Sequence, residues 1–144
     1  MPEQSFMDTE MGLDTGMELD TGMESRAKAA VERLGLLATY VDRLSAKFPL
    51  REHPGLRAQM RRAAMDGLSN GACCVEASPG RDHRSLLLRS LGAVSELETF
   101  SRLALAVGAV TTTEAEHLSF MVRVADQSLR ADLGRTTVGL RGVA

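Results

Sequence analysis

The chain has 144 residues, a formal net charge of −2 and 44% hydrophobic residues, which suffices for one domain with its own core. Only 3% of the residues are aromatic and none is tryptophan, so the core must consist of aliphatic side chains, which favour an all-α fold. No apolar run reaches the roughly 20 residues that cross a bilayer, and the first residues are acidic. We therefore expect a cytoplasmic protein that makes no contact with a membrane.

Residues 1–24 are acidic and repetitive. They hold seven of the 19 acidic residues and no basic one, so the remaining 120 residues carry 17 basic against 12 acidic residues, a net charge of +5. The repeat "MGLDTG", "MELDTG" at 11–16 and 17–22 has a period that fits neither helix nor strand and offers little apolar surface. We expect residues 1–24 to be a flexible extension. It is either an acidic arm that competes for the basic body or the product of a translation start placed too early.

From residue 25 the apolar residues take helical spacing. A first helix is predicted over about 26–47, before the prolines and glycine of "FPLREHPG", and a second continues to about 77, before "SPGRD". A long third helix follows, and Thr113 and Glu116 have the spacing of a capping box that opens a fourth. The inward residues are expected to be Leu34, Leu37, Val41, Leu44 and Phe48; then Leu56, Met60, Ala63, Gly67 and Gly71 or Cys74; then Leu86, Ala93, Leu97, Phe100, Ala104 and Val107; and finally Leu118, Val122, Ala125, Leu129 and Leu133.

Four helices of similar length with short connections predict an up-down-up-down four-helix bundle. We expect this bundle to span residues 25–134 and residues 135–144 to form a loose basic tail. The third helix carries a second apolar stripe, Leu87, Leu91 and Val94, about 100° from the first. This stripe indicates either an oligomer interface or a wide core face in a small bundle.

The arginines of "GLRAQMRRAAMDGLSN" (55–70) fall on two flanks of the second helix. Arg62 lies one turn before Asp66 and is predicted to hold carboxylates, with Glu96 or Glu98 of the third helix as the further candidate. Glu98 and Arg102 have the spacing of an i,i+4 ion pair. On the outer flank, Arg57 and Arg61 are one turn apart and are either solvated or able to follow phosphate oxygens.

The sequence offers no pattern typical of an enzyme. It contains no Ser/His/Asp or Cys/His arrangement and no glycine-rich phosphate loop, and the two cysteines, Cys73 and Cys74, are adjacent while the three histidines lie far apart. We therefore expect no catalytic residues, no metal site and no cofactor.

Several segments resemble one family. The stretches "FPLREHPGLRAQMRRAA" and "LGAVSELETFSRLALAVG", with Asn70 between them, are similar to the four-helix-bundle proteins encoded in intervening sequences of bacterial large-subunit ribosomal RNA genes. That superfamily includes the accessory variability determinant of diversity-generating retroelements. The resemblance covers about residues 26–134, and its most specific pieces are Phe48-Pro49, Gly55-Leu56, Gln59, Arg61 to Ala64 and Ser95 to Glu98. After Asn70 this chain has "GACC" where the family has "I-A-E-G".

The resemblance implies a ring-like homopentamer without catalytic activity. In the retroelement branch it implies binding to a reverse transcriptase and to RNA, and possibly cDNA, as a scaffold for mutagenic reverse transcription. For such binding the candidate residues are Arg57, Arg61, Arg81 and Arg84, and the scarcity of aromatic side chains predicts recognition of shape and charge rather than sequence. The alternative is an interaction module of the intervening-sequence type, with a protein partner and little affinity for nucleic acid.

Overall fold

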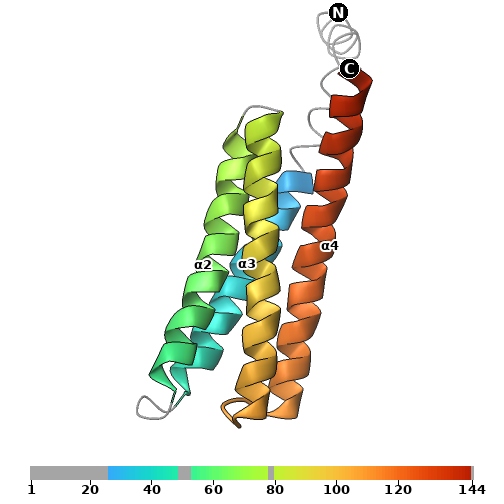
Figure 1. Ribbon diagram of the computed structural model, residues 1–144. Helices are drawn as coiled ribbons and strands as arrows, with labels where there is room; N and C mark the ends of the chain where they lie inside the picture. Colours follow the sequence, from blue (N-terminus) through green and yellow to red (C-terminus); the bar gives the residue numbers. More distant parts are fainter. Residues whose placement is uncertain (1–25, 49–52, 78–79, 144) are drawn as a thin grey trace, which may run out of the picture.

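The computed structural model describes residues 26–48, 53–77 and 80–143, with side chains as far as residue 134. Four helices pack side by side as an up-down bundle (Figure 1): a first helix over residues 26–46, α2 (Pro54–Glu76), α3 (Arg81–Ala106) and α4 (Thr112–Val143). The expected all-α bundle is confirmed. The predicted extension at residues 1–24 lies outside the described residues.

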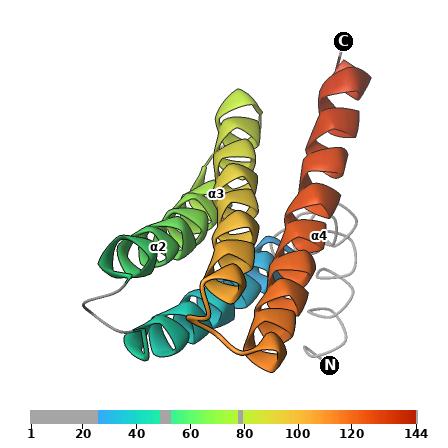
Figure 2. The ribbon, with the colours of Figure 1, turned by 60° about the horizontal axis from the view of Figure 1, so that its bottom comes forward.

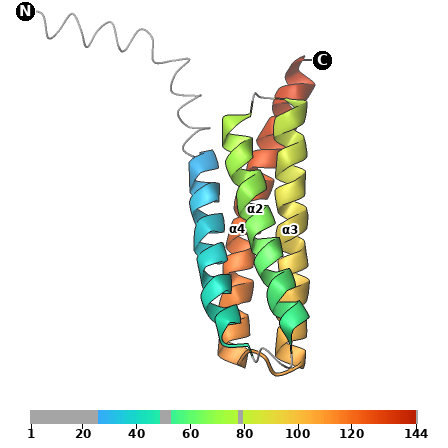
Figure 3. The ribbon, with the colours of Figure 1, turned by 90° about the vertical axis from the view of Figure 1, so that its left-hand side faces the viewer.

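The first helix closes the bundle between α2 and α4, as the views in Figures 2 and 3 show. Its contact with α4 includes a hydrogen bond of 2.6 Å from Arg33 Nη1 to Ser128 Oγ and an ion pair of 3.4 Å between Lys47 and Glu114. Among the described residues, none of the helices combines the length and the apolar character that a bilayer crossing requires.

The inward faces predicted for three of the four helices are confirmed. All five seam residues of the first helix are buried, α2 buries both alternatives Gly71 and Cys74, and α4 buries its seam from Leu118 to Leu129. Leu56 and Leu133 are half-buried against the same core. The 3.6-residue period therefore located these faces correctly.

The prediction for α3 is confirmed only in part, because its inward face is wider than predicted. Ala93, Leu97 and Ala104 are buried as expected. Leu87, Leu91 and Val94 are buried in the core of the chain itself, whereas Val107 is 42% exposed. Leu86 and Phe100 are only half-buried. The stripe Leu87, Leu91 and Val94 is thus the wide core face that was the alternative, and it presents no surface to a second copy.

Two buried serines are also part of the inward face of α3. Ser90 and Ser101 are 0% and 1% exposed and lie on the inward side of α3. A prediction based on the spacing of apolar residues does not include them, because serine is polar. Ser90 Oγ donates a hydrogen bond of 2.7 Å to the carbonyl of Gly67 on α2, which satisfies a buried hydroxyl. The two helices approach closely here, since a Cβ at Gly67 would lie 3.5 Å from Val94.

The helix ends differ from expectation at α4. Its capping box is formed by Thr111 and Glu114, not by Thr113 and Glu116: Glu114 N–H donates to Thr111 Oγ1 at 3.1 Å, and Thr111 N–H donates to Glu114 Oε1 at 3.0 Å. The helix continues through Gly134 to Val143, so a loose tail from residue 135 was wrong. In Figure 1 the end of α4 projects beyond the start of α3.

The α3–α4 turn requires glycine at one position. Gly108 has a φ of 76°, which only glycine adopts without strain. The N–H groups of Gly108 and Ala109 donate to the carbonyls of Leu105 and Ala104, at 3.1 and 2.8 Å, in the pattern of a Schellman motif. This motif ends α3 and turns the chain into the capping box of α4.

Candidate nucleic-acid interface

Arg62 lies where the sequence placed it, between two carboxylates. Its guanidinium donates to Asp66 Oδ2 at 3.0 Å and to Glu96 Oε2 at 2.9 Å, while Nε donates to Gln59 Oε1 at 2.9 Å. The predicted pairs with Asp66 and Glu96 are therefore confirmed, and they join α2 to α3. All three charged side chains are half-exposed.

Glu98 is not a partner of Arg62 but of Arg102. The predicted i,i+4 pair is present, with 3.6 Å between Arg102 Nε and Glu98 Oε1. The same oxygen accepts a hydrogen bond of 3.4 Å from Ser119 Oγ of α4, while Glu98 Oε2 is buried without a hydrogen-bond partner among the described residues. This carboxylate thus faces the α3–α4 contact rather than α2.

Arg61 was placed wrongly as a free outer arginine. Its Nε donates to Ser45 Oγ at 2.8 Å, and its Nη2 lies 3.2 Å from the Asp42 carbonyl oxygen and 3.3 Å from Asp42 Oδ1. Ser45 is fully buried on the first helix. Arg61 therefore fastens α2 to the first helix, and its guanidinium is engaged within the bundle.

The remaining candidates do not form one surface in this chain. Arg57 is in the first turn of α2, whereas Arg81 and Arg84 begin α3, which starts at the other end of α2. A rise of about 1.5 Å per residue puts Arg57 about 28 Å along α2 from Glu76. Within one chain these residues therefore do not share a surface, and their joint role in an oligomer stays a prediction.

The start of α3 carries an arginine-lined hollow. Arg81, Arg84 and Arg89 surround a shallow, open depression together with Ser85 and Leu88. All three arginines are exposed, and no carboxylate lies within ion-pair distance of them in the part of the chain that the structure describes. They are thus available to a solvent-borne anion. Sequence reasoning missed Arg89, although its place about two turns after Arg81 is a usable signal.

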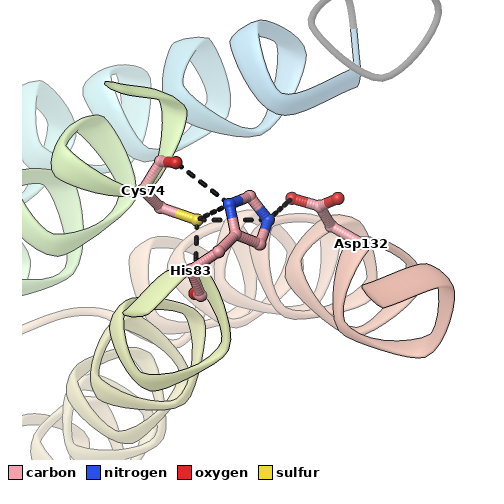
Figure 4. Close-up of side chains that lie close together, drawn as sticks. All are labelled: Cys74, His83 and Asp132. Atoms are coloured by element: carbon pink, nitrogen blue, oxygen red, sulfur yellow. Dashed lines mark hydrogen bonds and ion pairs between the residues drawn. The ribbon is translucent and has the colours of Figure 1, made fainter. Parts of the chain in front are cut away.

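The fold also brings together a cluster that sequence reasoning missed. Cys74 of α2, His83 of α3 and Asp132 of α4 meet at one end of the bundle (Figure 4), and one ligand atom of each lies within 4.8 Å of the others. The conclusion that the sequence holds no Cys/His or metal-ligand arrangement was therefore wrong. The local signal is a cysteine in the last turn of one helix and a histidine in the first turn of the next, because these turns face each other across a tight connection.

The cluster is poorly suited to nucleophilic catalysis. Burial, and to a lesser extent the charge of Asp132, raises the pKa of the Cys74 thiol to about 12. Without a bound cation the sulfur is therefore protonated at neutral pH, whereas the reactive species of cysteine is the thiolate.

Comparison of the chain with protein-family models and with curated proteins gives no match.

Proposed function

We propose that this chain is a non-enzymatic accessory protein that binds nucleic acid and a reverse transcriptase, as the accessory variability determinant family that it resembles does. The observation that carries the proposal is the hollow lined by Arg81, Arg84 and Arg89, whose guanidinium groups have no carboxylate partner among the described residues. The all-α four-helix bundle agrees with the fold that the resemblance implies.

The chemistry of the hollow suits a phosphate backbone. Guanidinium groups donate bidentate hydrogen bonds to phosphate oxygens, and Arg81 and Arg84 lie in the first turn of α3, where the helix dipole also favours an anion. Aromatic residues make up only 3% of the chain, so stacking on bases contributes little. We therefore propose that the chain binds RNA, and possibly cDNA, with little preference for sequence.

The chain outside residues 1–24 is also cationic as a whole. Outside residues 1–24 the chain has a net charge of +5, which attracts polyanions over a Debye length of about 10 Å at 0.1 M salt. Arg61 and Arg62 contribute to that net charge, but they form ion pairs with Asp42, Asp66 and Glu96. We therefore propose that the arginines of the hollow, rather than these two, contact the nucleic acid.

We also propose that the chain assembles as a homo-oligomer, with the pentamer as the expected ring. The contact cannot use Leu87, Leu91 and Val94, which are buried. Exposed apolar side chains are present on every helix and are the remaining candidates: Leu36, Met65, Leu88, Leu103, Leu105 and Phe120. Light scattering of the full chain at micromolar concentration should give the mass of an oligomer, and the mass of one chain would contradict this part of the proposal.

Binding to a structured RNA at low salt tests the nucleic-acid part. Arg84→Ala combined with Arg89→Ala should weaken the affinity several-fold in fluorescence anisotropy, because the variant loses two of the arginines that we propose contact phosphate groups. The matched control is Arg43→Ala combined with Arg123→Ala, which removes the same charge from exposed positions on the first helix and α4. Equal effects of the two pairs would contradict a localised site.

Failure of the wild-type chain to bind either RNA or single-stranded DNA would remove the nucleic-acid role. The interaction module of the intervening-sequence type would then be the better account, with the exposed apolar side chains as its contact surface.

A further inference from the structure

We propose that Cys74, His83 and Asp132 form a binding site for one divalent transition-metal ion, and that Zn²⁺ fits this donor set best. A thiolate, an imidazole and a carboxylate are all zinc ligands. The sulfur and the imidazole select against Mg²⁺ and Ca²⁺, which prefer oxygen ligands. The site is independent of the arginine-lined hollow and of the proposed function.

Two of the three distances between the donor atoms are those of neighbouring zinc ligands, and all three atoms lie within 4.8 Å of one another. Cys74 Sγ lies 3.5 Å from His83 Nε2, and His83 Nε2 lies 3.6 Å from Asp132 Oδ2. In a tetrahedral zinc site, with bonds of about 2.3 Å to sulfur and about 2.0–2.1 Å to nitrogen and oxygen, neighbouring ligand atoms are about 3.3–3.6 Å apart. The Nε2 to Oδ2 distance is longer than a hydrogen bond but matches this spacing.

A hydrogen bond made by one ring nitrogen orients the imidazole of His83 toward Asp132. His83 Nδ1 lies 3.1 Å from the Cys74 carbonyl oxygen, to which it can donate its proton. Nε2 then faces the Asp132 carboxylate, whereas the Cys74 sulfur lies nearer to Nδ1 (Figure 4). A backbone carbonyl that accepts from the second nitrogen of a ligating histidine is a common feature of zinc sites. The sulfur is 3.2 Å from Nδ1 and 3.5 Å from Nε2, so an ion bound by all three side chains requires the imidazole to turn until one ring nitrogen faces both Cys74 and Asp132.

The three side chains are buried and held in place by the bundle. Cys74 is 2% exposed, and the side chains of His83 and Asp132 are 13% and 5% exposed. One turn away from each lies a buried residue of the core, at Gly71, Leu87 and Leu129 respectively. Donor atoms that come from three helices and share one buried position differ from a solvated surface cluster, because they are largely removed from water.

Three protein ligands leave one position of a tetrahedral ion for water or another small ligand. The ion would join the last turn of α2, the first turn of α3 and the distal half of α4. It would thus fasten the end of the bundle at which the α2–α3 connection lies, in the way that structural metals stabilise small domains.

Titration of the full, reduced, metal-depleted chain with Co²⁺ tests the proposal. We expect one ion per chain, a near-ultraviolet thiolate-to-cobalt charge-transfer band and visible bands with the intensity of four-coordinate cobalt. Zn²⁺ should displace the cobalt and abolish these bands, and it should raise the melting temperature, because it binds the folded chain.

Two adjacent cysteines supply a matched pair of variants. Cys74→Ser should abolish the charge-transfer band, whereas Cys73→Ser, at the exposed neighbouring position, should leave it unchanged. His83→Gln and Asp132→Asn should each lower the cobalt affinity by more than the roughly 10–100-fold typical of a lost second-shell contact. Far-ultraviolet circular dichroism checks that each variant is folded.

The wild-type spectrum decides the outcome even where a variant does not fold. A wild-type chain without a charge-transfer band in excess Co²⁺ overturns the proposal, and so does a band that persists in Cys74→Ser or is lost in Cys73→Ser. The cluster would then be a hydrogen-bonded group without a metal.

Discussion

At the scale of single residues, the adjacent arginines of α2 hold different neighbours. Arg61 donates to the fully buried hydroxyl of Ser45 and to Asp42, so it is part of the contact with the first helix. Arg62 lies on the other flank, between the half-exposed carboxylates of Asp66 and Glu96. Exposed ion pairs contribute little to stability because water and salt screen them. In contrast, a substitution that leaves a buried hydrogen-bond acceptor without its donor lowers the free energy of unfolding substantially.

Arg61→Ala should therefore lower the free energy of unfolding by about 1–2 kcal/mol, and Arg62→Ala should lower it less. Urea denaturation followed by circular dichroism measures both. Arg61→Lys is the control. It keeps a positive charge near Asp42, but it lacks the planar guanidinium group that contacts Asp42 and Ser45 simultaneously. A larger loss for Arg62→Ala than for Arg61→Ala would show that the flank toward the first helix contributes little.

The sequence predicted the charge partners of Arg62 but not the role of Arg61, for a geometric reason. Both arginines lie at the margin of the apolar face of α2, and helical periodicity says which residues share a flank but not which neighbouring helix that flank meets. The partner of Arg61 is also a backbone carbonyl and a serine, which no charge pattern indicates. The cluster of Cys74, His83 and Asp132 was missed similarly, since Asp132 is distant in sequence and its proximity depends on how α4 packs.

At the scale of helices, apolar spacing was sufficient wherever the inward positions were apolar or glycine. It was incomplete for α3, where Ser90 and Ser101 are also buried and Val107, which was expected inward, is exposed. It also ended the fourth helix at Gly134, although glycine ends a helix only when the chain adopts a left-handed conformation there. Gly108 does so and ends α3, while α4 continues past Gly134.

The run Thr111 to Thr113 offers two registers for the capping box of α4, and the structure uses the earlier one. Thr111→Ala should lower the free energy of unfolding by about 1 kcal/mol, because an N–H at the start of α4 loses its acceptor. Thr113→Ala, in the same run but inside the helix, should change it little. Thermal or urea denaturation of the two variants measures the difference, and equal losses would contradict the assigned register.

The capping box also predicts a dependence on pH. The hydrogen bond from the Thr111 backbone N–H, with smaller contributions from the Thr111 hydroxyl and Lys47, lowers the pKa of Glu114 in the folded chain. A carboxylate whose pKa is lowered by folding contributes stability above its unfolded pKa of about 4.3, and that contribution is lost as the pH falls through the folded pKa. Glu114→Gln should therefore cost stability at neutral pH and have less effect in acid. The urea midpoints of the wild-type chain and of Glu114→Gln, compared at neutral pH and in acid, measure this difference. An equal loss of stability under both conditions would contradict the prediction.

At the scale of the whole molecule, the arginine-lined hollow and the proposed metal site both lie at the end of the bundle where α3 begins. His83 of the proposed metal site lies between Arg81 and Arg84 in sequence, so the turn of helix that carries the cluster also carries two residues of the hollow. The fold class and most of the core followed from the sequence. The arginine-lined hollow was predicted only in part. The sequence grouped Arg57 and Arg61 with Arg81 and Arg84, but the first pair lies near the start of α2 and the second pair lies beyond its end.

The central claim is that the arginines at the start of α3 bind a phosphate backbone. Its most direct test is the slope of log affinity against log salt concentration for a structured RNA, measured for the wild-type chain and for Arg81→Ala, Arg84→Ala and Arg89→Ala combined. Each lost phosphate contact lowers the magnitude of the slope by about 0.7–0.9, so we expect a reduction of about 2–3 for each chain engaged. A slope that the triple substitution leaves unchanged would contradict the claim.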